Sequence, residues 1–268
     1  EILDNPEEDW IDTPTQKVIE LDDGAWELLD QWLPYVKRVF MTGGEPTIIK
    51  RNLDYINKIV SSGRSKEVEL IFTTNATNIN KKFIEIGQNF KSVSYNVSVD
   101  AVEDLARYIR YPSDWNTVDK NLRNIGRGVS LNTTIQWLNM TRLNEIFNYI
   151  ENCGIGFQLV PDPSYLDPIY APRFMKEKCI SDIKNFLNRP FLQEEKHNNI
   201  LSGGLKQSLI QTKQFLEQNL NNVKHIDEFL KRMAILDRLR GQKLFDVLPE
   251  LQQLGGHNED SKEKKQKT

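Results

Sequence analysis

Two glycines and an acidic residue follow an apolar run near the start of the chain, a pattern typical of a ligand-binding turn. The block Met41-Thr42-Gly43-Gly44-Glu45-Pro46 begins at the last residue of an apolar run, residues 36–41. The β-branched and apolar side chains of this run predict a buried strand. Glycines let a ligand approach the backbone closely, and Glu45 adds a carboxylate beside exposed carbonyl groups. The predicted chemistry is therefore the binding of a ligand that carries cationic hydrogen-bond donors.

Polar residues also follow the next predicted strands. Thr74 and Asn75 come after residues 68–73, Ser98 and Asp100 stand at the end of residues 93–99, and Pro161-Asp162-Pro163 follows residues 155–160. In parallel sheets, ligands bind outside the carboxyl ends of the strands. The sequence therefore predicts that these residues and the glycine block converge on one rim.

The elements that must position this rim alternate between two kinds of segment. The predicted strands are residues 36–41, 68–73, 93–99, 129–137 and 155–160. The predicted helices between them are residues 48–60, 81–90, 115–125 and 142–152. Five strands joined by four helical crossovers predict an α/β fold with a parallel sheet.

The chain divides into four predicted regions. A polar lead-in of residues 1–34, with one amphipathic helix near residues 23–33, precedes a β/α core of residues 35–171. Residues 172–254 have helical periodicity without strands, and residues 255–268 form a charged tail that we expect to be disordered. The helical region carries two apolar stripes: Leu205, Leu209, Leu216 and Leu220, and Phe229, Met233, Leu236 and Leu239.

Composition limits the partners. The 268 residues carry a net charge of -3, which gives no overall field for nucleic acid or an anionic membrane. Because no apolar stretch approaches the roughly 20 residues that span a bilayer and no secretory signal begins the chain, we expect a cytoplasmic protein. The only cysteines, Cys153 and Cys179, are too far apart for a compact ligand set, and structural roles are expected for them and for the three histidines.

Four short stretches resemble motifs of the radical S-adenosylmethionine (SAM) superfamily in the same order: residues 42–46, 73–75, 96–101 and 109–111. The resemblance implies a partial TIM-like (β/α)6 barrel with a helical C-terminal appendage. It also implies the small-molecule cofactor SAM and a [4Fe-4S] cluster, from which a 5′-deoxyadenosyl radical is generated to modify a substrate.

The resemblance implies cofactor-binding roles for nine residues. Gly43, Gly44 and Glu45, with Pro46 completing the motif, match the residues that hold the methionine amino group. Ser98 and Asp100 match positions near the ribose or carboxylate of the cofactor. Thr74 and Asn75 match a turn that faces the cofactor or substrate, and Arg110 matches a residue that supports the carboxylate or the glutamate.

The chain departs from the family in its cysteines. The family holds its cluster through a CxxxCxxC segment upstream of the glycine motif, and no cysteine precedes Cys153 here. The resemblance therefore implies that the first strand and the cluster loop lie upstream of Glu1, and that these 268 residues alone are inactive. Residues 236–241 and 245–250 resemble the ending of members with a twitch/SPASM domain, which implies a peptide or protein substrate.

Other interpretations stay open at this stage. The chain could be a cluster-free barrel that acts as a binding or scaffold protein, or a nucleotide-binding α/β protein, although it lacks GxGxxG and GxxxxGK[ST] loops. The glycine block could be only a turn that sets Glu45 at a helix N-terminus, and Thr74-Asn75 could likewise be only a turn. Ser98 and Asp100 could cap a helix, and Arg110 could pair with Asp114.

Overall fold

The structure, a computed structural model, describes residues 21–126, 128–150, 154–159, 163–190 and 203–255. The chain separates into two compact units, residues 1–37 and residues 38–268. In the first unit, helix α1 (Asp23–Trp32) is capped by Asp22, whose Oδ1 accepts a hydrogen bond of 2.7 Å from Ala25 N. A single 3₁₀ turn, η2 (Leu33–Tyr35), follows it.

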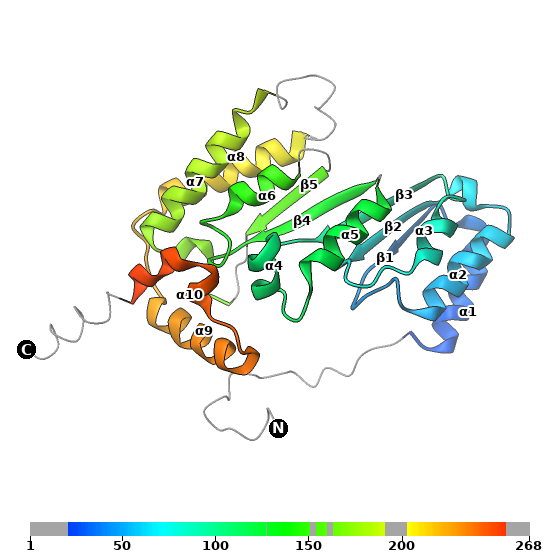
Figure 1. The fold of residues 1–268 in the computed structure, drawn as a ribbon. Helices are drawn as coiled ribbons and strands as arrows, with labels where there is room; N and C mark the ends of the chain where they lie inside the picture. Colours follow the sequence, from blue (N-terminus) through cyan, green and yellow to red (C-terminus); the bar gives the residue numbers. More distant parts are fainter. Residues whose placement is uncertain (1–20, 127, 151–153, 160–162, 191–202, 256–268) are drawn as a thin grey trace, which may run out of the picture. The chain divides into compact units, whose positions relative to one another are not determined.

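The second unit is built on one five-stranded sheet in the order β1-β2-β3-β4-β5, and all four strand pairs are parallel. The strands are β1 (Arg38–Met41), β2 (Glu69–Thr74), β3 (Ser92–Ser98), β4 (Val129–Ile135) and β5 (Gly154–Leu159). The helices that join them are α2 (Lys50–Ser61), α3 (Lys81–Gly87), α4 (Glu103–Ile109), α5 (Trp115–Ile125) and α6 (Leu143–Tyr149). The predicted α/β fold is confirmed, with sequential strands as neighbours (Figure 1).

Several predicted boundaries were wrong by a few residues, for identifiable reasons. The fourth strand ends at Ile135 rather than Trp137, because Gln136 N donates to Asn139 Oδ1 and Trp137 N donates to Leu166 O instead of continuing the sheet. The first strand begins at Arg38 rather than Val36, whose N–H closes the preceding 3₁₀ turn. Helix α4 was not predicted at all, because seven residues with mixed polarity give no clear period.

The two faces of the sheet differ in chemistry. Along β2, Leu70, Phe72 and Thr74 are buried, while the alternate residues are half-buried. Phe72 stacks on Tyr95 of β3 at 5.3 Å and meets Phe83 of α3 edge-on at 5.6 Å, so α3 covers this face. The opposite face carries half-buried polar side chains: Thr73, Asn96, Ser98 and Asn132. This polar face adjoins the strand ends where the sequence predicts a site.

The region after the sheet is helical, as predicted. It contains η4 (Pro168–Tyr170), α7 (Arg173–Leu187), α8 (Gly203–Gln218), α9 (Ile226–Arg240), α10 (Leu244–Val247) and η7 (Pro249–Leu254). Of the two predicted stripes, Leu209, Leu216, Phe229 and Met233 are buried, whereas Leu239 is 43% exposed. Gly241 ends α9 with a φ of 62°, a conformation that glycine adopts without strain.

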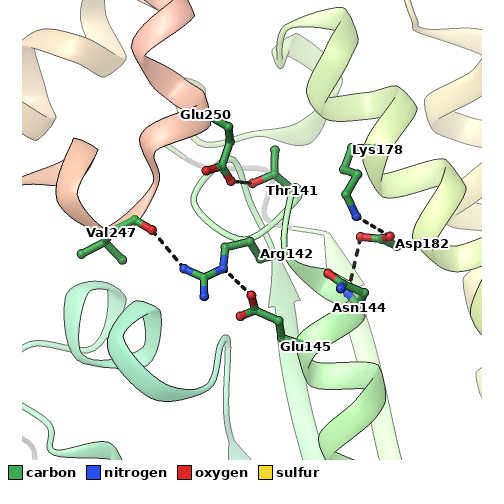
Figure 2. A network of polar contacts seen from close by, with 8 residues as sticks. All are labelled: Thr141, Arg142, Asn144, Glu145, Lys178, Asp182, Val247 and Glu250. Carbon is green, nitrogen blue, oxygen red and sulfur yellow. Dashed lines mark hydrogen bonds and ion pairs between the residues drawn. The ribbon is translucent and has the colours of Figure 1, made fainter.

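Polar contacts tie the C-terminal elements to the loop after β4 (Figure 2). Thr141 Oγ1 donates to Glu250 Oε1 at 2.6 Å, and Arg142 Nη1 donates to Val247 O at 3.0 Å. The same Arg142 pairs with Glu145 of α6 at 2.6 Å. Residues 247–250 are therefore anchored beside the carboxyl end of β4.

A buried lysine joins three helical elements in the same region. Lys176 of α7 is 0% exposed, and its Nζ donates at 2.7 Å to the carbonyl oxygens of Ile169, Asn219 and Asn222. Burial lowers the pKa of this ammonium group to about 8. All three donors are satisfied by main-chain acceptors, one within η4 and two after α8, so Lys176 acts as a structural clamp.

We expect Lys176→Met to lower the free energy of unfolding by about 3 kcal/mol, because it leaves three carbonyl groups without their donor. Urea unfolding followed by circular dichroism measures this loss. Lys184→Met is the matched control, since Lys184 lies on the same helix, is 53% exposed, and makes an exposed pair with Glu217. Equal losses from the two substitutions would contradict the clamp.

No helix in the described ranges is both long enough and apolar enough to cross a membrane. Some predictions fall outside those ranges. They concern the role of Cys153, the polar residues Pro161 and Asp162, and the charged tail of residues 256–268. The proposed four-region division of the chain stays a prediction.

Candidate functional site

The carboxylate of Glu45 joins the carboxyl ends of β1 and β2. Its Oε1 accepts hydrogen bonds from Thr47 Oγ1 at 2.7 Å and Thr47 N at 3.3 Å. Its Oε2 accepts from Asn75 N at 3.0 Å, and the hydroxyl of Thr74 lies 2.8 and 2.7 Å from the two oxygens. The structure thus brings together three of the residues that the sequence singled out.

The two oxygens of Glu45 differ in their remaining capacity. Thr74 has one hydroxyl hydrogen, which the two oxygens share, and Oε2 has one further donor, the N–H of Asn75. Oε1 has the N–H of Thr47 and the Thr47 hydroxyl, whose hydrogen can also reach Asn78 O at 3.0 Å. A carboxylate offers about four lone-pair sites. Glu45 Oε2 therefore retains room to accept a hydrogen bond from a ligand, while Oε1 serves to fix the side chain.

The two glycines before Glu45 leave open space beside this carboxylate. Gly43 has a φ of 121°, which side chains rarely adopt, and a Cβ added at either glycine meets no atom within 4 Å. Backbone conformation therefore requires glycine at position 43. At position 44, no steric contact within the described residues requires it, so the space there is available to a ligand.

Asn75 shapes the turn after β2. Its Oδ1 accepts hydrogen bonds from Thr77 N at 2.9 Å and Thr77 Oγ1 at 2.6 Å. The buried Ala76 between them adopts a φ of 56°, and its carbonyl accepts from Asn121 Nδ2 of α5 at 2.8 Å. Asn75 Oδ1 therefore forms a turn, as one of the two interpretations of Thr74-Asn75 predicted. In this turn the N–H of Asn75 also donates to Glu45.

A second polar group forms at the end of β3. Asp100 is 5% exposed and its carboxylate is held from two sides, by Thr134 N on Oδ1 at 2.9 Å and by Arg110 Nη2 on Oδ2 at 2.7 Å. Asn139 Nδ2 also donates to the Asp100 carbonyl at 2.8 Å. The alternative pairing of Arg110 with Asp114 is wrong. Arg107 is the residue whose guanidinium lies 3.5 Å from Asp114.

The capping alternative for Ser98 and Asp100 is also wrong. Helix α4 begins after Val102, which makes no side-chain capping bond. Ser98 ends β3 on the half-buried polar face, in register with Asn132 of β4. Pro46 is buried, and its carbonyl accepts a hydrogen bond from Asn52 Nδ2 of α2 at 3.0 Å. Pro46 thereby contributes to the start of α2, and Ser98 faces the polar side of the sheet.

A cleft of about 710 Å³ lies against the second polar group. Its wall includes Asn75, Asp100, Arg110, Tyr111 and Gln136. Arg110 is half-buried there, and its Nε is a buried donor without an acceptor among the described residues. Since Asn75 lines this cleft and also binds Glu45, it links the two polar groups.

Two residues of this arrangement were missed by the sequence analysis. Thr47, which holds Glu45 Oε1, lies two positions after the acid, a spacing that allows a hydroxyl to bond the preceding carboxylate. Asn139, which is 0% exposed, supports both Asp100 and the carbonyl of Thr134. No local pattern distinguishes Asn139 from a loop asparagine, because its partners are Thr134 of β4 and Asp100, which lies after β3 and is 39 residues away in sequence.

Cys179 is the cysteine that lies in the described part of the chain. Cys179 is fully buried in α7, and burial raises the pKa of its thiol far above the ordinary value. Among described residues, no group of three histidine, cysteine or acidic side chains could hold a metal ion. Cys179 is therefore a structural thiol, as the sequence analysis expected.

We expect Thr74→Val to lower the free energy of unfolding by about 1.5 kcal/mol, because Glu45 loses a donor and the buried Ala76 N–H loses its acceptor. Thr73→Val is the matched control, since Thr73 is the preceding residue of β2 and its side chain points to the opposite, half-buried face. Urea unfolding of both variants provides the comparison. A cost for Thr73→Val as large as that for Thr74→Val would show that Thr74 makes no special contact.

Comparison with known proteins identifies one family. The sequence profile of the Radical SAM superfamily matches residues 11–145. No curated protein matches the chain.

Similar solved structures include native anSMEcpe with bound AdoMet and the Cp18Cys peptide, at 13% identity and a TM-score of 0.45, which covers 58% of this chain and 48% of that one. Another is SuiB of Streptococcus suis bound to S-adenosylmethionine, at 16% identity and a TM-score of 0.43, covering 60% of this chain and 38% of that one. The chain thus spans half or less of the length of these two solved relatives.

Proposed function

The chain belongs to the radical SAM superfamily, and on that basis we propose that its parallel sheet is the SAM-binding core of a radical enzyme. The cofactors of this superfamily are SAM and a [4Fe-4S] cluster. The observation that carries the proposal is the Glu45 carboxylate, which is fixed by Thr47, Thr74 and Asn75 and stands beside the open space at Gly43 and Gly44.

The residues at the strand ends fit the methionine part of SAM. A methionine group presents an ammonium with three donors and a carboxylate that accepts hydrogen bonds. Glu45 Oε2 and the carbonyls beside Gly43 and Gly44 match the ammonium group. The unsatisfied Arg110 Nε matches an acceptor such as a carboxylate or a ribose hydroxyl, and charge-assisted bonds of this kind are the stronger ones.

Each residue has one task in this proposal. Glu45 binds the ammonium group, and Thr74 and Asn75 keep its carboxylate oriented. Asp100 holds Arg110 through Nη2 in the wall of the cleft, and Ser98 supplies a hydroxyl on the polar face of the sheet. When bound, SAM would supply radical chemistry, for which the electron would have to come from a reduced [4Fe-4S] cluster.

The 268 residues do not fit the cluster. Three thiolates are required to hold it with one iron open, and this sequence contains Cys153 and the buried Cys179 only. We therefore propose that the cluster ligands lie upstream of Glu1 in a longer protein. The resemblance of residues 236–250 to a twitch-type ending supports a peptide or protein substrate for that protein.

A second candidate function rests on the same cysteine count. A cluster-free barrel that binds SAM or a related amino acid derivative, and acts as a binding or scaffold protein, needs no thiolate set. Both candidate functions use the same pocket, so a measurement of SAM binding does not distinguish them. Release of 5′-deoxyadenosine does, because only the radical enzyme forms it.

We expect the 268-residue chain to bind SAM, and Glu45→Gln to weaken binding at least about thirtyfold by removing the charge that faces the ammonium group. Isothermal titration calorimetry measures both affinities. Glu85→Gln on α3 is the matched control, because Glu85 is exposed and lies outside the site. Unchanged affinity in Glu45→Gln, with binding by the parent chain, would refute the assignment of Glu45.

We expect the longer protein, reconstituted anaerobically with iron and sulfide and reduced with dithionite, to release 5′-deoxyadenosine from SAM. Chromatography coupled to mass spectrometry detects this product. Glu45→Ala in that protein should abolish its release. Absence of the product from a protein with a full iron content would refute the radical chemistry. A longer protein that takes up no cluster and still binds SAM would favour the cluster-free alternative.

A further inference from the structure

Helix α9 contacts the end of α4 and the residues that follow it. Asp237 Oδ1 accepts a hydrogen bond of 2.8 Å from the hydroxyl of the buried Tyr108. Arg240, one turn further along α9, donates from Nη1 to the carbonyl oxygen of Tyr108 at 3.2 Å. The same guanidinium lies over the ring of Tyr111, 5.3 Å from its centroid. Figure 1 shows α9 and α10 beside α4.

The bond from Arg240 replaces one that the helix cannot make. In an α-helix the carbonyl of residue 108 would accept from the N–H of residue 112, but residue 112 is proline and has no N–H. The last turn of α4 is thus left with an acceptor that needs an outside donor. Arg240, which is far away in sequence, supplies it.

The segment held in this way forms a wall of the cleft. Arg110 is the C-cap of α4 and pairs with Asp100, and Tyr111 is the next residue. Both line the cleft of about 710 Å³. Tyr111 is 48% exposed, so its ring is not fixed by burial. The position of Tyr111 in this wall therefore depends on the contact that Arg240 of α9 makes with its ring.

We propose that Arg240 is a positioning residue for the cleft: it completes the end of α4 and stacks on Tyr111, and so holds the wall to which Arg110 and Tyr111 belong. The expected effect of Arg240 on SAM binding rests on the function proposed above. Its expected effect on the end of α4 and on Tyr111 does not, because that effect follows from the contacts of Arg240 alone. Through this residue the C-terminal helical region sets the affinity of a site to which it contributes no ligand.

The test compares Arg240→Met with Lys231→Met in the 268-residue chain. Lys231 is an exposed cation on the same helix and touches neither Tyr108 nor Tyr111. Amide hydrogen exchange is measured over residues 105–113 and, as an internal reference, over α5. SAM affinity is measured by calorimetry. Arg240→Lys is included because lysine keeps the charge and N–H donors but loses the planar face.

We expect Arg240→Met to raise exchange at Arg110 and Ser113, whose N–H groups are hydrogen-bonded, about fivefold and to weaken SAM binding about fivefold, without faster exchange in α5. Arg240→Lys should show smaller changes in both amide exchange and SAM affinity. If Arg240→Met does not fold, Arg240→Lys is compared with Lys231→Met in its place. Exchange in residues 105–113 that is unchanged, or raised equally by Lys231→Met, would overturn the proposal.

The two proposals can fail separately. If the parent chain does not bind SAM, the cofactor assignment fails, while the exchange comparison still decides whether Arg240 holds the segment. If the parent binds SAM and Arg240→Met exchanges faster with unchanged affinity, the cofactor assignment stands and the influence of α9 on the site is refuted.

Discussion

The rest of the site depends on one constraint, the fixation of the Glu45 carboxylate between two parallel strands. Its donors come from residue 47, from the end of β2 and from the turn after β2, so the side chain cannot move without breaking contacts on both sides. A carboxylate held in this way pays little conformational entropy when a ligand binds. The adjacent glycines complete the arrangement by leaving the space in front of it open.

In the second polar group, the Asp100–Arg110 pair, the buried and the half-buried residue have different roles. Asp100 is almost fully buried and makes its contacts with protein groups, whereas Arg110 reaches the cleft. Supports for this pair come from Thr134 of β4, from Asn139 in the loop after β4, and from Arg240 of α9. Contacts between residues 247–250 and the loop after β4 keep the C-terminal elements close to the same rim (Figure 2).

Sequence patterns predicted the strands, most crossovers and the residues at the strand ends, because burial and period are local properties. The meeting of Glu45 with Thr74 and Asn75 follows from parallel pairing, so it was predictable too. The support of Asp100 by Asn139 and of Tyr108 by Arg240 was not, because those partners are 39 and 132 residues apart and no local pattern marks them. Helix α4 was missed for its shortness.

The central claim is that SAM binds across the ends of β1, β2 and β3. Titrating the isotopically labelled 268-residue chain with SAM and following backbone amide shifts by NMR tests it most directly. The account predicts the largest shifts at Gly43, Gly44, Asn75 and Asp100. A second hollow of about 780 Å³ is lined by residues 172–174 and 223–228. Shifts confined to that hollow, or no saturable shifts at all, would contradict the account.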